Sequence, residues 1–219
     1  MGAWFRLAAL IAAPLLLAGC LLTPGKFTSK LTINADRGFT YAYAGEVYAI
    51  DPQPAVVDPS GKEAPPDPKQ KAEQEARNRA IAEALSKEAG YRSVRYLGDG
   101  KFLIDYEISG RLDHNFIYPF NLDAQAIVPF VAVELRANGT VRVKAPGFAN
   151  DSKDQAGPMS GMGGDSGAKL DGSFVLDTDA EIVSTNNEDG PQVAGGRRVL
   201  SWKVTPLTRD APTAVLRMR

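Results

Sequence analysis

Apolar and polar residues alternate strictly in several runs of this chain, and this period of two constrains the fold more than any other feature. Phe27, Leu31 and Ile33 fall on one face of the first run, with lysines and threonines on the other. The same alternation returns in residues 39–50 and 102–108. Because successive side chains of a strand point to opposite faces, such runs are typical of strands with one buried face. The chain is therefore expected to be rich in β-structure.

Turn-forming residues separate these runs. Asp36-Arg37-Gly38 lies between the first two runs, Gly98-Asp99-Gly100 precedes the third, and Asn138-Gly139 lies between two later ones. Short polar turns with glycine join neighbouring strands as antiparallel hairpins. Further strands are expected at residues 91–97, 127–135, 141–143, 174–176, 180–184, 200–204 and 214–218.

One segment carries the signals of a helix. Asp67 is suited to cap its start, Pro68 to occupy its first position and Gly90 to end it. A narrow stripe of small and apolar residues is expected to pack on the sheet, and an exposed helix that binds a partner is the alternative. The stripe comprises Ala72, Ala76, Ala80, Ile81, Ala84 and Leu85. These elements together predict an α+β fold with a mainly antiparallel sheet, a ββαββ start and one main helix packed on the sheet.

Residues 1–19 have the pattern of a bacterial signal peptide. Arg6 precedes an apolar run that is shorter than the roughly 20 residues needed to span a bilayer. The run leads to Cys20, the only cysteine, and Leu17-Ala18-Gly19-Cys20 resembles the lipobox of bacterial lipoproteins. The resemblance implies that the thiol receives a diacylglyceryl group, that the chain is cut before Cys20, and that the new amino terminus is acylated. A buried thiol near an ordinary secretory cleavage site is the alternative.

A lipid anchor at Cys20 would fix where the protein works. Two or three acyl chains hold a protein stably to a membrane, and residues 20–25 would form the lipidated tether. Leu21 stands where inner-membrane lipoproteins carry aspartate, so the resemblance favours the periplasmic face of the outer membrane in the cell envelope. With this thiol acylated, no cysteine is left for disulfides, catalysis or metal binding.

Composition favours a single exported domain over residues 26–219. Its length suffices for one hydrophobic core. The chain has 25 basic and 26 acidic residues, and this near balance excludes the basic field that captures nucleic acid. Residues 51–68 are rich in proline and are expected to be a loop. Residues 151–168 are rich in glycine and serine and are expected to be a flexible loop.

The residues that could carry chemistry are few, and no catalytic residue, metal or other cofactor is expected. His114 is the only histidine, and the chain has no Gly-x-Ser-x-Gly motif to pair with it. Asp177, Asp179 and Glu181 alternate along an expected strand, with Glu188 and Asp189 following in a turn. Carboxylates can bind calcium, but the EF-hand spacing is absent, so solvated carboxylates are favoured over a calcium site.

The densest aromatic patch is Phe116, Tyr118 and Phe120. Two interpretations are open. The patch is either an edge strand that tolerates Pro119, or the lip of a groove that binds an acyl chain or another apolar ligand.

A late segment gives a second resemblance. Residues 181–186 read Glu-Ile-Val-Ser-Thr-Asn, and Gly190 and Leu200-Ser-Trp202 follow. Together with strands close to the cysteine and a capped helix, they resemble the LppM-type lipoprotein domain. That resemblance implies an α+β exported domain, lipid or envelope association, and no established catalytic residues.

The sequence therefore predicts a non-enzymatic envelope lipoprotein that binds an apolar ligand, such as a lipid, or an envelope component. The alternative is a structural or assembly lipoprotein that works through protein contacts at a sheet edge or the 151–168 loop. A hydrolase built on His114 is the third and least favoured hypothesis.

Overall fold

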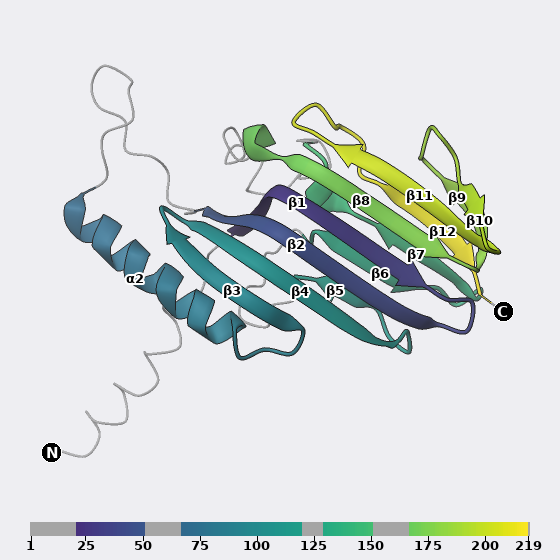
Figure 1. Cartoon of the computed structure of the whole chain (residues 1–219), viewed down its shortest axis with the longest axis horizontal. Helices are drawn as coiled ribbons and strands as arrows, with labels where there is room; N and C mark the ends of the chain where they lie inside the picture. The colour runs from purple at the N-terminus through teal and green to yellow at the C-terminus, as the bar shows by residue number, and fades with distance from the viewer. Residues whose placement is uncertain (1–20, 51–66, 120–128, 151–166, 219) are drawn as a thin grey trace, which may run out of the picture.

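Two β-sheets packed face to face form the body of the protein (Figure 1). A computed structural model describes residues 21–50, 67–119, 129–150 and 167–218. The first sheet has the order β10-β11-β8-β1-β2-β4-β3 and the second the order β5-β6-β7-β12-β9. The strands of the first sheet are β1 (Leu21–Ile33), β2 (Gly38–Ile50), β3 (Tyr91–Gly98), β4 (Lys101–Arg111), β8 (Asp171–Thr178), β10 (Gln192–Ala194) and β11 (Arg197–Val204). Those of the second are β5 (Phe116–Tyr118), β6 (Val131–Leu135), β7 (Thr140–Lys144), β9 (Glu181–Thr185) and β12 (Thr213–Arg217).

The α+β class and the mainly antiparallel pairing are confirmed, but the expected arrangement of the strands is not matched. β8 pairs with β1 in parallel, so the first sheet is mixed. Within that sheet β4 lies beside β2, and β3 takes the edge position. The correction has a topological cause. The alternation in a strand shows that one face is buried, but it carries no information about which strand lies beside it.

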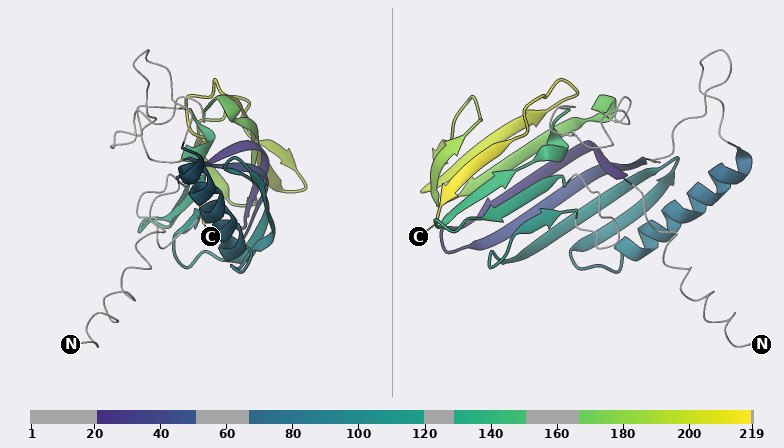
Figure 2. Two further views of the ribbon diagram at one scale, coloured as in Figure 1. Left: turned by 90° about the vertical axis from the view of Figure 1, so that its left-hand side faces the viewer. Right: turned by 180° about the vertical axis from the view of Figure 1, so that it is seen from behind.

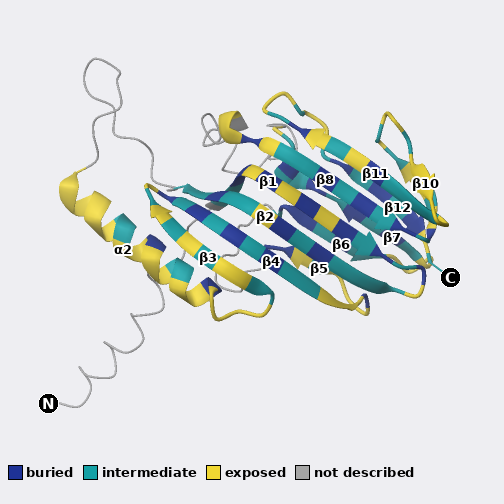
Figure 3. Cartoon of the chain, viewed as in Figure 1, coloured by how far each residue is buried: buried dark blue, intermediate teal, exposed yellow. Residues whose placement is uncertain are grey.

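The core lies between the two sheets, and the alternation of the sequence places it there. In β1, Phe27, Leu31 and Ile33 are buried, as their shared face predicts. The second sheet contributes buried residues in the same alternating way, among them Val141 and Val143 of β7. Figure 3 shows the result as buried and less buried positions alternating along the central strands. Each sheet thus covers the apolar face of the other.

The first strand starts earlier than the sequence suggested. β1 begins at Leu21, and Leu21 pairs with Ile50 of β2. Pro24 and Gly25 are buried. Residues 21–25 therefore belong to the folded domain, which corrects the expected tether and the domain start at residue 26. The apolar-polar alternation missed this part because Leu21-Leu-Thr-Pro-Gly breaks the period of two.

The helix α2 (Pro68–Leu85) starts where its capping signals indicate. Asp67 caps it by accepting a hydrogen bond of 2.9 Å from the backbone N–H of Lys69. The helix lies along β3, at one edge of the first sheet (Figures 1 and 2). Tyr96 of β3 ties it there: its hydroxyl donates to Glu75 at 2.7 Å and lies 3.3 Å from the side-chain nitrogen of Asn78.

The helix face that meets the sheet agrees only in part with the expected one. Ala72, Ala76, Ala80 and Ala84 are exposed, while Asn78 and Leu85 are buried and Ile81 is half-buried. The predicted stripe is therefore wrong for its four alanines and right for Ile81 and Leu85. The helix ends at Leu85, before the expected Gly90. Because it lies at a sheet edge and makes polar contacts there, a stripe of small apolar residues does not identify its buried side.

Several local predictions are confirmed. Hairpins join β1 to β2, β3 to β4 and β6 to β7. At the first turn the left-handed conformation falls on Arg37, with a φ of 75°, rather than on the glycine that follows it. Two short 3-10 helices, η2 (Pro146–Phe148) and η3 (Gly167–Lys169), complete the described structure.

Other sequence predictions fall mainly outside the described residues. These include the signal peptide with Cys20, most of the two expected loops and Phe120. Among the helices that the structure describes, none combines the length and the apolar composition needed to cross a membrane.

Candidate functional site

A row of aromatic rings crosses the inner face of the first sheet and meets the edge of the second. Adjacent rings in the row lie 4.5 to 5.5 Å apart, centre to centre. Such distances are typical of aromatic pairs that attract each other. In order, the row consists of Phe39, Phe116, Tyr41, Tyr118, Tyr106 and Tyr91. The rings come from β2, β5, β4 and β3, so the row depends on both sheets.

The middle of this row is buried and its ends reach the surface. Tyr41 and Tyr118 expose 0% and 2% of their area. Phe39, Phe116 and Tyr91 are half-buried. Burial raises the pKa of the Tyr41 and Tyr118 hydroxyls well above the ordinary value, so both stay neutral at physiological pH. The row is thus uncharged, and the aromatic rings at both of its ends are partly exposed to solvent.

The three residues of the predicted groove differ in how far they are buried or described. Tyr118 is buried in the core, Phe116 is half-buried, and Phe120 lies outside the described residues. β5 is the edge strand of the second sheet, which agrees with the edge-strand interpretation. Ile117, between the two rings, exposes 41% of its area on the other side of the strand. A groove lined by all three aromatic residues stays a prediction.

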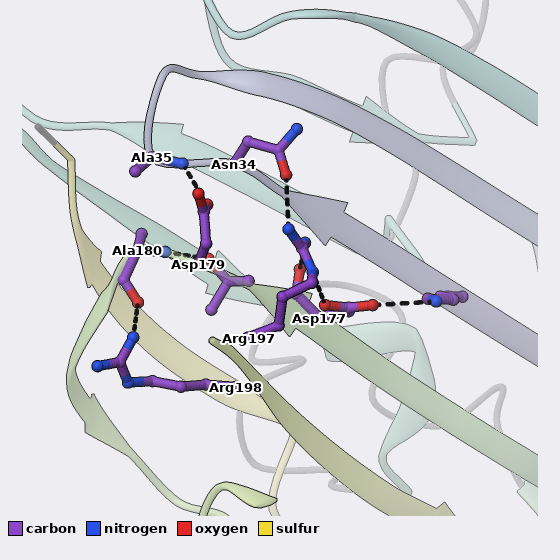
Figure 4. A network of polar contacts seen from close by, with 9 residues as sticks. Asn34, Ala35, Asp177, Asp179, Ala180, Arg197 and Arg198 are labelled. Carbon is purple, nitrogen blue, oxygen red and sulfur yellow. Dashed lines mark hydrogen bonds and ion pairs between the residues drawn. The ribbon is translucent and has the colours of Figure 1, made fainter. Parts of the chain in front are cut away.

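Three of the carboxylates considered for calcium bind different partners, and Figure 4 shows those of Asp177 and Asp179. Asp177 accepts from Arg197 at 2.5 Å and forms an ion pair with Lys30 at 3.1 Å. Asp179 accepts a hydrogen bond from the backbone N–H of Ala35. Glu181 pairs with Arg217 of β12 at 2.8 Å. Their roles in the described structure are to tie strands together. No group of three potential metal-ligating His, Cys, Asp or Glu side chains is found among the described residues.

The electrostatics of Asp177 show how tightly it is held. Partial burial acts to raise the pKa of its carboxyl, but the hydrogen bonds and charges of Arg197 and Lys30 outweigh this effect. The net result is a lowered pKa, so the carboxylate stays ionised to a lower pH than usual. Arg197 also donates to the side-chain oxygen of Asn34 at 3.1 Å. The network therefore joins β1, β8 and β11.

His114 lies away from this network. It is exposed in the short turn between β4 and β5, next to the exposed residues Asp113 and Asn115. Asn115 has a structural role, because its side chain accepts from the backbone N–H of Leu135 at 2.8 Å.

A polar cleft that the sequence gave no reason to expect lies between the ends of both sheets. Its volume is about 610 Å³, and Trp202 and Asn187 each place a polar atom there. The lining residues are Arg142, Lys144, Asn186, Asn187, Glu188, Asp189, Ser201, Trp202, Lys203, Thr208, Arg209, Asp210, Ala211 and Thr213. They come from β7 and from three stretches between residues 186 and 213, so no single local motif marks them. The sequence analysis noted Trp202 as part of a strand and Glu188 and Asp189 as carboxylates that could bind calcium, but nothing in the sequence joined them into one site.

Comparison with known proteins adds little to these observations. No protein-family model matches the chain. No curated protein matches it by sequence. Among solved structures, the folded domain of the Mycobacterium tuberculosis LppM protein, determined by NMR, is similar to it. The two are 17% identical, the match covers 90% of this chain and 91% of that one, and the TM-score is 0.31. A TM-score this low carries no argument about shared function.

Proposed function

We propose that this chain is a non-enzymatic lipoprotein of the bacterial cell envelope, anchored through Cys20, whose domain binds an apolar ligand such as a lipid. The periplasmic face of the outer membrane is its proposed location. The proposal includes no catalytic residue, metal or nucleic-acid partner.

The row of aromatic rings carries the ligand-binding part of the proposal. Its buried middle is neutral, while Phe39 and Phe116 at one end and Tyr91 at the other are only half-buried. An apolar chain that covers these ends would remove aromatic surface from water, which stabilises a complex by about 25 cal/mol per Å² of apolar area. Phe116 is the ring of the predicted groove that remains accessible in the described structure.

The anchor supports the envelope location and brings the domain close to the membrane. β1 begins at Leu21, one residue after the proposed lipidated cysteine. No flexible tether of several residues would then separate the domain from the bilayer. A Cys20→Ala variant should lose the anchor and leave the membrane fraction, and intact-mass analysis should show no acyl mass on it. An unmodified Cys20 in the membrane-bound wild-type chain would overturn the anchor.

Native mass spectrometry tests the ligand. The wild-type chain, gently extracted from membranes, should retain a lipid-sized adduct that is lost on unfolding. Phe116→Ala should reduce the adduct-bearing fraction, because it removes one of the half-buried rings of the row. Ile117→Ala is the matched control: Ile117 is on the same strand but faces away, so the adduct should persist. A wild-type chain without an adduct, or equal loss in both variants, would contradict binding at the aromatic row.

A sheet edge favours the second candidate, a structural or assembly role through protein contacts. β10 is one of the two edge strands of the first sheet, and all three of its residues are exposed, with Val193 at 72%. An exposed strand edge can pair with a strand of another protein. In-cell crosslinking from position 193 that recovers the same partner repeatedly would support this role, and recovery of none would count against it.

A further inference from the structure

One end of the first sheet lies next to the proposed lipid anchor. Leu21 is the first residue of β1 and directly follows Cys20. β2 runs antiparallel to β1 and therefore ends where β1 begins (Figure 1). Within this end, Tyr48 of β2 pairs with Thr23 of β1. Because a strand advances about 3.3 Å per residue, Tyr48 lies about 10 Å from the anchor, measured along the strand.

Lysine side chains lie around the ring of Tyr48. Tyr48 follows the buried Val47, so its side chain is on the outer face of the first sheet. The ammonium of Lys169 lies 4.5 Å from the centre of the Tyr48 ring, and that of Lys101 lies 5.8 Å from it. Both cations are within the distance at which an aromatic face attracts them. Tyrosine has an apolar ring and a polar tip, which suits it to the boundary between membrane and water.

The charges at this place have a small positive excess. Lys26 and Lys169 are exposed, and within the described part of the chain no ion pair joins either to a carboxylate. Lys101 pairs with Glu46 at 2.6 Å. Asp171 of β8 is exposed and lies opposite Lys26 in the strand register. Three lysines thus stand against two carboxylates, and two of the lysines are available to an anion.

An exposed leucine lies at the same end of the sheet. Leu97 exposes 53% of its area and precedes the turn between β3 and β4. That turn adjoins the end of β2, because the backbone oxygen of Gly100 accepts from the N–H of Ala49 at 2.8 Å. Asp99 of the turn is paired with Lys71 at 3.0 Å, so the pair adds no net charge. Apolar side chains beside lysines are typical of surfaces that lie on a membrane.

We propose that an anchor-side surface of the first sheet rests on a bilayer that contains anionic lipids. This surface consists of Lys26, Tyr48, Leu97 and Lys169. The two lysines bind lipid phosphates, while the tyrosine and the leucine enter the headgroup layer. The contact depends on the proposed anchor at Cys20, but it does not depend on an apolar ligand in the aromatic row.

Fluorescence quenching in vesicles tests this contact. The one cysteine of the acylated chain carries the lipid on its sulfur, so a thiol-reactive fluorophore labels only a second, introduced cysteine. Leu97→Cys places the label on the anchor-side surface. Ser109→Cys is the matched control, because Ser109 is exposed near the other end of β4. The full-length chains are placed in vesicles of equal parts phosphatidylcholine and phosphatidylglycerol that include a lipid with a nitroxide on its headgroup. The label at position 97 should be quenched, and the label at position 109 should not.

Charge variants test the role of the anionic lipid. Lys26→Gln and Lys169→Gln should each lower the ratio of quenched to unquenched label at position 97 by about fivefold, the contribution of one lysine near an anionic surface. Arg111→Gln removes an exposed cation from the far end of β4 and should leave the ratio unchanged. Quenching should also fall in phosphatidylcholine alone, and at about 1 M salt, where the Debye length is about 3 Å.

Intact-mass analysis of the same samples separates this contact from the anchor. Equal quenching at positions 97 and 109, or quenching at neither, would overturn the contact if the chain carries the acyl mass, and the anchor would stand. Unchanged quenching in both lysine variants would overturn the binding of lipid phosphates by these side chains. A membrane-bound chain without the acyl mass would overturn the anchor and the contact together.

Discussion

The carboxylate of Asp179 accepts a 2.7 Å hydrogen bond from the backbone N–H of Ala35, across a sequence separation of 144 residues. Ala35 lies in the turn that joins β1 to β2, and Asp179 follows directly after β8. β1 and β8 are the one parallel pair in the first sheet. Parallel strands are joined by a long crossover connection and not by a hairpin. The bond therefore links the ends of β1 and β8, which no turn connects.

Removing that carboxylate should loosen the end of the parallel pair. Asp179→Ala should lower the free energy of unfolding by about 1–2 kcal/mol, because a buried backbone N–H loses a charged acceptor. Asp179→Asn keeps an oxygen acceptor and should lose roughly half as much. Urea unfolding measures both values, and hydrogen exchange at the Ala35 amide gives the local readout. Unchanged exchange at Ala35 in Asp179→Ala would contradict this role.

The neighbouring Asp177 should make stability depend on pH. Its folded-state pKa is lowered, so its contribution is present above the unfolded value of about 3.9 and is lost as pH falls through the folded value. Asp177→Asn should therefore cost about 1–2 kcal/mol at pH 7, a value that allows for the exposure of Lys30 and Arg197. The cost should shrink as pH falls below about 4.

Asp171→Asn is the control for that pH series. Asp171 begins the same strand, β8, and is exposed. Its substitution should change stability by less than about 0.5 kcal/mol at any pH in the series, as is usual for surface sites. An Asp177→Asn penalty that is the same at pH 3 and pH 7 would show that its charge is not the cause.

Local features of the fold could be predicted from the sequence, and long-range ones could not. The alternation of Phe27, Leu31 and Ile33 identified both a strand and its buried face, because burial on a sheet repeats every second residue. The insertion of β8 beside β1 was not predictable, because the pairing joins residues such as Leu31 and Leu176 from distant segments. Apolar residues of the same kind fit several possible neighbours.

For the candidate sites too, the sequence showed local groups of residues but not the contacts between distant segments. Phe116 and Tyr118 were visible as an aromatic patch, but their exposure depends on Tyr41 and Tyr106, which come from other strands. The polar cleft was invisible, since Arg142 and Trp202 are 60 positions apart and each reads as an ordinary strand residue. Sequence periodicity shows which face of a single strand or helix is buried. A cleft is formed by several elements together, so periodicity does not reveal it.

The face of α2 that meets the sheet can be tested with two adjacent residues. The sequence placed both in the packing stripe, but only Leu85 is buried, while Ala84 is exposed. Leu85→Ala should lower the free energy of unfolding by about 2 kcal/mol, through lost burial and a cavity. Ala84→Lys should change it by less than about 0.5 kcal/mol, because the new side chain extends into water. Thermal unfolding compares them, and a larger loss in Ala84→Lys would restore the alanine stripe as the packing face.

Phe27 pairs with a glycine on each side, Gly45 of β2 and Gly172 of β8. Its ring lies 4.3 Å from that of Phe148, centre to centre, in the core between the sheets. A Cβ at residue 172 would lie 2.5 Å from the carbonyl oxygen of Phe27 and 2.6 Å from its ring. The backbone oxygen cannot turn away as the end of a flexible side chain can. The two glycines therefore let three central strands approach one another around a large aromatic ring.

Gly172→Ala should lower the free energy of unfolding by about 3 kcal/mol, the upper part of the range for overpacking, because the clash involves backbone. Ser173→Ala is the control on the same strand, since it adds no atom and should change stability by less than about 1 kcal/mol. Urea unfolding of both variants measures the difference. Hydrogen exchange across β1 and β8 should rise only in Gly172→Ala, as the parallel pair is forced apart. Equal stability of the two variants would show that β8 can shift to accept a side chain at residue 172.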